Sequence, residues 1–135
     1  MKSRNALIRL KRFDVEEKRR KVAEIETMIG EFNHMAVDLD RQIAIEQERA
    51  GVSDVNHYAY PTFAKAAIQR RNNLSASAAD LAAKLAAARD EFDGACEELK
   101  KIELLEERDA ERLRLEQGRT APSDLDEVGV HRVAS

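Results

Sequence analysis

The chain contains no tryptophan, and its two tyrosines and four phenylalanines make aromatic residues only 4% of the sequence. Charged residues, by contrast, make up 36% of its 135 residues. A globular core needs more bulky side chains than this, whereas long helices are rich in Ala, Leu, Glu, Lys and Arg. The length favours one domain. The composition therefore predicts a helical protein that acts through its surfaces, because it has no interior in which to perform chemistry.

Cysteine, proline and long apolar runs are also scarce. The single cysteine, Cys96, excludes a disulfide within the chain and fits a reducing compartment. No apolar run approaches the roughly 20 residues of a membrane span, and the basic N-terminus lacks the apolar segment of a secretory signal. The net charge of −3 argues against nucleic acid as the main partner. We expect a cytoplasmic protein.

Two ladders of apolar residues with a period of 3.5 residues are the strongest pattern in the sequence. The first has apolar residues at six consecutive heptad a positions, namely Ile8, Val15, Val22, Ile29, Ala36 and Ile43, with Lys11, Lys18, Ile25, Phe32 and Leu39 at d. The second runs through Leu74, Ala78, Leu81, Leu85, Ala88, Phe92, Ala95, Leu99 and Ile102. This period keeps one face of a helix against a partner helix. The ladders predict two long helices packed on each other.

One segment breaks the helical pattern before the C-terminal region. It contains Gly51 and Pro61, and a proline cannot lie deep inside a helix. We predict a helix over about residues 4–49, a turn over 50–61 and a helix over about 62–117, ended by Gly118. The apolar periodicity is absent from residues 119–135, which we predict to be a disordered tail. The predicted fold class is all-α, with one hairpin domain over residues 1–118.

The charges of the two helices indicate an antiparallel arrangement. Residues 1–21 hold nine Lys/Arg and three Asp/Glu, whereas residues 90–110 hold three and nine, so the net charges are +6 and −6. A turn centred near residues 55–56 places residue i opposite residue 111 − i, which brings these two segments together. A parallel dimer of the first helix would instead juxtapose two +6 ends. Flanking charge complementarity selects orientation, and it favours the hairpin.

Residues that could carry chemistry are too scattered to form a site. Glu31 and His34 have the Glu-x-x-His spacing of di-iron bundles, but there is no second copy and His34 lies off the apolar face. His57 falls in the turn and His131 in the tail. No Ser or Cys has a helical neighbour that could act as a base, and no glycine-rich phosphate loop is present. We expect no enzymatic activity, no cofactor and no metal.

A basic segment near the N-terminus is the first candidate for partner binding. Its members are Arg9, Lys11, Arg12, Lys18, Arg19, Arg20 and Lys21. One interpretation is a solvated helix face that the acidic segment 90–110 partly neutralises, and another is a basic surface for an acidic protein partner. Binding to nucleic acid or anionic lipid is also conceivable, although the net acidity disfavours nucleic acid.

The turn is the second candidate. Tyr58, Tyr60 and Phe63 are half of the six aromatic residues, and they cluster there beside His57 and Pro61. Exposed aromatic side chains on a rigid tip are typical of protein-binding anchors. The alternative is a local cap in which Tyr60 and Phe63 close the end of the apolar face.

Several segments resemble alphaproteobacterial proteins of the FliJ family. They are Met1-Lys-Ser-Arg, Leu7-Ile-Arg-Leu-Lys-Arg-Phe13, Val15-Glu-Glu-Lys-Arg-Arg20, Gln47-Glu-Arg-Ala-Gly51, Tyr58-Ala-Tyr-Pro-Thr62 and Glu98-Leu-Lys-Lys-Ile-Glu103. The similarity covers about residues 1–115, and the C-terminal tail has no counterpart in the family. Its most specific parts are the opening residues and the turn, because coiled coils share Glu, Lys and Leu for general reasons.

The resemblance implies a role in flagellar type III protein export. A protein of this family is a small antiparallel coiled-coil stalk whose terminal end enters the hexameric export ATPase ring. Its other surface contacts the membrane export gate protein FlhA and binds export chaperones. This would place the chain in the cytoplasm at the inner face of the flagellar basal body, peripheral to the membrane only through its partners. The alternative function is a generic cytoplasmic coiled-coil chaperone or scaffold.

Overall fold

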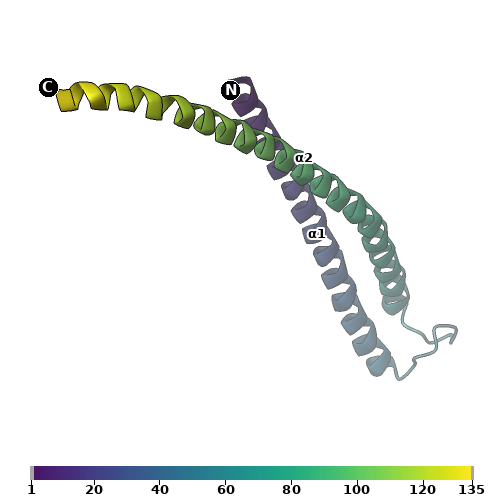
Figure 1. Cartoon of the computed structure of the whole chain (residues 1–135). Helices are drawn as coiled ribbons and strands as arrows, with labels where there is room; N and C mark the ends of the chain where they lie inside the picture. Colours follow the sequence, from purple (N-terminus) through teal and green to yellow (C-terminus); the bar gives the residue numbers. More distant parts are fainter. Residues whose placement is uncertain (1, 135) are drawn as a thin grey trace. The chain divides into compact units, whose positions relative to one another are not determined.

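The computed structural model describes the backbone of residues 2–134 and the side chains of residues 3–119. The chain is all-α and consists of α1 (Lys2–Ala50) and α2 (Thr62–Ala134), two long helices packed against each other as a hairpin (Figure 1). The predicted fold class is therefore confirmed.

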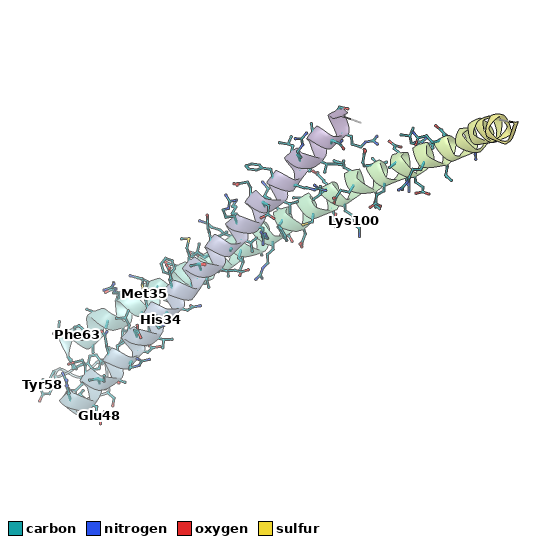
Figure 2. All side chains as sticks on the ribbon, turned by 90° about the vertical axis from the view of Figure 1, so that its left-hand side faces the viewer. His34, Met35, Glu48, Tyr58, Phe63 and Lys100 are labelled. Atoms are coloured by element: carbon teal, nitrogen blue, oxygen red, sulfur yellow. The ribbon has the colours of Figure 1, made fainter. Side chains whose placement is uncertain are left out.

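The chain divides into two units, each of which contains a part of both helices. The tip unit comprises Glu16–Asp93, including the turn, and the terminal unit comprises Met1–Val15 and Gly94–Ser135. Within the tip unit, α1 and α2 lie side by side on either side of the turn (Figures 1 and 2).

Helix ends agree with the predicted turn but not with the predicted C-terminal end. α1 ends at Ala50, where Gly51 takes a left-handed φ of 67° and its N–H is 3.3 Å from the carbonyl oxygen of Glu48. α2 begins at Thr62, directly after Pro61. α2 continues beyond the expected end near residue 117, to Ala134, and Gly118 has no positive φ. A glycine inside a helix costs only about 1 kcal/mol, so it does not force an end.

The predicted tail covers residues 119–135, and the side chains of residues 120–135 lie outside the described part of the structure. The disorder expected for this segment stays a prediction.

Both apolar ladders are shielded from solvent. No ladder position of α1 from Ile8 to Ile43 is exposed, and none of α2 from Leu74 to Ile102. Six of the ten buried apolar residues are alanines, and these are Ala36, Ala64, Ala67, Ala78, Ala88 and Ala95. Small side chains let two helix backbones approach closely, but they bury little apolar area per turn. The resulting seam is narrow and continuous along each ladder.

The antiparallel register lies close to the predicted mirror rule, and the pair farthest from it in the tip unit, Arg89 with Glu26, is four residues away. In the tip unit, Arg71 Nη1 of α2 is 2.9 Å from Asp40 Oδ1 of α1, and residue 40 is the counterpart that the rule gives for residue 71. Lys21 Nζ is 3.8 Å from Glu91 Oε2, one residue from its expected counterpart. These exposed pairs contribute at most about 1 kcal/mol each, so they specify the register more than they stabilise it.

Two isoleucines of α1 test whether the seam carries the stability. Ile43 is 5% exposed on the ladder, whereas Ile45 is 45% exposed on the outer surface. We expect Ile43→Ala to lower the free energy of unfolding by about 2 kcal/mol, and Ile45→Ala to change it by less than about 0.5 kcal/mol. Urea unfolding followed by circular dichroism measures both. Equal effects of the two substitutions would contradict this account of the seam.

Candidate functional site

The basic segment is largely neutralised within the chain. In the terminal unit, Lys11 Nζ is 2.7 Å from Glu98 Oε2, and Arg12 Nη2 is 3.0 Å from Glu103 Oε2. Each pair joins α1 to α2. Hydrogen bonding to Glu98 raises the pKa of Lys11, and the same contact lowers the pKa of Glu98. These two basic side chains therefore bridge α1 and α2 and are partly neutralised within the chain.

The remaining members of the basic segment behave similarly, with one exception. In the tip unit, Arg19 pairs with Glu16, Arg20 with Glu17 and Lys21 with Glu91, and Lys18 is half-buried and also has an interaction within the chain. Arg9 is exposed and has no acidic partner among the described residues. Six of the seven predicted residues thus have interactions inside the chain, and Arg9 is the member that has none with the described residues.

Charged residues continue the seam of the terminal unit where the apolar ladder ends. Arg4 occupies a d position and is paired with Asp109 and, at 3.4 Å, with Glu106, both of which continue the ladder of α2. All three side chains are shielded in part from solvent. Hydrogen bonds from Arg4 and then Arg112 lower the pKa of Asp109. This part of the seam is therefore polar.

Large apolar side chains lie on the outside of the same unit, which the sequence analysis missed. The terminal unit has 39 of the 117 described side chains but seven of the fourteen exposed large apolar ones, which are Leu7, Leu10, Phe13, Leu104, Leu105, Leu113 and Leu115. The heptad register contained the signal, because Leu7, Leu10 and Phe13 fall at g, c and f, all outside the seam. The terminal unit therefore has charged groups in its seam beyond the apolar ladder and large apolar groups on its outside.

Two shallow hollows accompany these apolar residues. One, of about 270 Å³, is lined by Ser3, Arg4, Leu7, Ile102 and Leu105. The other, of about 380 Å³, lies on α2 and is lined by Glu106, Asp109, Ala110, Arg112, Leu113 and Glu116. Leu113 is the next ladder residue after Asp109, and it is exposed because the mirror rule gives it no counterpart in α1. An apolar surface with adjacent ionic groups is suited to contact with another protein.

The turn is held by a series of hydrogen bonds. The carbonyl oxygen of Asp54 accepts from the N–H of His57 at 3.0 Å, and the carbonyl oxygen of His57 accepts from the N–H of Tyr60 at 3.1 Å. The side chain of Asp54 also accepts from the N–H of Asn56, and Nδ1 of His57 accepts from the N–H of Ala59, each at 3.0 Å. These bonds form two consecutive tight turns, in which Asp and Asn side chains are typical.

The three aromatic residues of the turn have different environments. Tyr60 is 7% exposed, and its hydroxyl oxygen accepts a hydrogen bond from Gln47 Nε2 at 2.8 Å. Tyr58 is 96% exposed and stacks on His57, with ring centroids 4.5 Å apart. Phe63 is 55% exposed, and Figure 2 shows it near Tyr58 at the turn. Tyr60 therefore closes the end of the seam, while Tyr58 and Phe63 are open to a partner.

Histidines and acidic residues do not gather into a metal site in the described part of the chain. Nε2 of His34 is 3.6 Å from Asp38 Oδ2 on the outer surface of α1. His131 lies outside the described side chains. Among the described residues, no helix is long and apolar enough to cross a membrane.

Comparisons with models of protein families, with curated proteins and with solved structures give no match.

The ion pairs of the terminal unit make its packing sensitive to pH. Because the pKa values of Glu98 and Asp109 are lowered in the folded chain, their contribution is present above the ordinary values of 4.5 and 3.8 and is lost as the pH falls below them. We expect amide protection over residues 4–15 and 98–109 to hold from pH 7 to about pH 4.5 and to fall below it, before that over residues 25–43. Hydrogen exchange with mass spectrometry measures this. Glu98→Gln should weaken the dependence, and a uniform loss along the chain would contradict it.

Proposed function

We propose that the chain is a non-enzymatic stalk of flagellar type III protein export, of the FliJ type. In this proposal its terminal unit binds the hexameric export ATPase, and its turn binds the gate protein FlhA. The support comes from the resemblance of the sequence, from the two-helix hairpin and from the two exposed surfaces described above. Binding of export chaperones is part of the same proposal.

The outward apolar residues of the terminal unit are the observation that carries the proposal. A coiled coil that works alone in water normally has apolar residues in its seam and charged residues outside. Here Arg4, Lys11 and Asp109 lie along the seam while Leu10 and Phe13 face outward. Such a surface is costly in water and suits a protein that surrounds it. A ring with a partly apolar lining is a partner of that kind.

The basic segment contributes to ring binding through a smaller set of residues than the sequence suggests. Six of its members have partners inside the chain, so a ring would have to compete with those contacts. Arg9 is exposed and lies next to Leu10 on the outer side of α1. We therefore assign the first contact with the ATPase to Arg9, Leu10 and Phe13.

Replacing the outward apolar residues tests the ATPase contact. We expect Leu10→Ser with Phe13→Ser to weaken stimulation of a purified flagellar export ATPase at least about tenfold in apparent affinity, because two exposed apolar contacts are lost. Val37→Ser with Ile45→Ser is the matched control, since both residues are exposed on α1 in the tip unit. Phosphate release at increasing concentrations of the chain measures the affinity. Equal stimulation by both variants would refute the assignment, and Arg9→Glu tests the charge separately.

The tip contact is tested by separating the exposed aromatic residues from the buried one. We expect Tyr58→Ala with Phe63→Ala to reduce binding to the gate protein at least about tenfold without loss of helix content, because both side chains are exposed. Tyr60→Phe removes only the hydroxyl group that contacts Gln47, so it should leave binding within about twofold. Pull-down titration with the purified cytoplasmic part of the gate protein measures both. Undiminished binding of the double variant would exclude this tip contact.

The thin seam supports the alternative of a generic coiled-coil chaperone or scaffold. Six of the ten buried apolar residues are alanines, so little apolar area opposes opening of the helices. A chaperone of this kind would use the ladder residues after partial opening. It would lose function through Leu85→Asp and would be indifferent to changes at Leu10 and Phe13, which distinguishes it from the stalk.

A further inference from the structure

Acidic residues recur at every seventh position along the outer side of α1 in the tip unit. Glu17, Glu24, Glu31 and Asp38 all occupy the heptad c position. Glu24 and Glu31 are exposed, and neither has a basic partner among the described residues. Glu17 is paired with Arg20, and Asp38 is 3.8 Å from Arg41 and 3.6 Å from His34. The middle of this acidic row is therefore open to a cation from outside.

Two methionines lie in the g row, between the acidic row and the seam. Met28 and Met35 are 42% and 44% exposed and are seven residues apart (Met35 is labelled in Figure 2). Charged residues usually occupy g in a two-helix coiled coil, whereas apolar residues beside the seam are typical of contact with a further helix. Methionine is flexible and adapts to varied partners. Next to Met35 a hollow of about 200 Å³ is lined by Met35, Asp38, Leu39, Gln42 and Arg70.

The neighbouring part of α2 presents little that would obstruct a further helix. Between residues 74 and 88 only Asp80 and Lys84 are charged, and eight residues are alanines. Small side chains permit close approach of another backbone. The apolar contact of the methionines is thus accompanied by small side chains on the α2 side and by the carboxylates of Glu24 and Glu31 on the α1 side, with Arg70 of α2 at the Met35 end.

We propose that Met28, Met35 and the acidic row form a docking surface for a basic amphipathic helix of a partner protein. Its apolar stripe would cover the methionines, and Lys or Arg at every seventh position would face Glu24 and Glu31. Two residues seven apart on a helix are about 10.5 Å apart, so a partner helix with the same repeat can match each carboxylate in turn. This surface includes none of the residues assigned to the ATPase and the gate, and the proposal does not depend on that function.

A designed peptide tests the surface directly. The probe is a fluorescein-labelled helix of about three heptads with Leu at a and d and Lys at e and g, and its control has Glu in place of Lys. Fluorescence anisotropy is recorded with the full-length chain at increasing salt. We expect the Lys peptide to bind, the Glu peptide not to bind, and the affinity for the Lys peptide to fall as salt rises.

Variants of the chain identify the residues. We expect Glu24→Lys with Glu31→Lys, and separately Met28→Ser with Met35→Ser, to weaken Lys-peptide binding at least about tenfold. Glu97→Lys with Glu107→Lys is the control with the same change of net charge, at exposed positions of the terminal unit, and it should bind within about twofold of the unaltered chain. Circular dichroism verifies that each variant keeps its helix content.

Three results would overturn the proposal. The first is equal binding of the Lys and Glu peptides to the chain. The second is an affinity for the Lys peptide that does not change when Glu24 and Glu31 are replaced by Lys. The third is that the Lys peptide does not bind the folded chain. Sedimentation velocity of the chain alone adds a check on a second copy as the occupant. Self-association that the methionine substitutions abolish, without peptide binding, would assign the surface to that second copy instead.

Discussion

This hairpin is held together by a narrow apolar seam, to which each helix contributes one row of a and d side chains. The exposed surfaces of the molecule depend on that narrowness. The seam uses isoleucine, leucine and many alanines, so each helix commits only about two of every seven positions to it. The other positions remain available for interactions with partners. A protein of this form has no enclosed interior. Its function therefore depends on the identity and the position of the residues outside the seam.

Charge determines how the two helices meet and also limits which charges can reach a partner. The basic N-terminal segment resembles a binding patch in the sequence, but Lys11, Arg12 and Lys21 face acidic residues of α2. These contacts fix the antiparallel orientation and largely neutralise the segment. Apolar residues and Arg9 then become the more distinctive external features of α1 in the terminal unit. The same positive charges therefore serve assembly of the hairpin more than recognition.

The sequence predicted the fold well because periodicity and helix breakers are local signals. The ladders predicted which positions are shielded, and Gly51 and Pro61 predicted the turn. α2 continues past Gly118, because a glycine inside a helix is only mildly unfavourable and does not by itself end it. The environments of Tyr58 and Tyr60 could not be predicted, since they depend on two tight turns and on a bond from Gln47 across the end of the seam. The exposure of Leu7 and Leu10 could have been predicted, because their heptad positions, g and c, lie outside the seam.

The proposed stalk function rests on a terminal unit that has charges in its seam and apolar groups outside it. The most direct test is hydroxyl-radical footprinting of the full chain, with and without a purified flagellar export ATPase. We predict that Leu10, Phe13 and Leu113 become protected when the ATPase is added, while Tyr58 and Met35 react as before. Unchanged reactivity of Leu10 and Phe13, or protection confined to Tyr58 and Met35, would contradict the account.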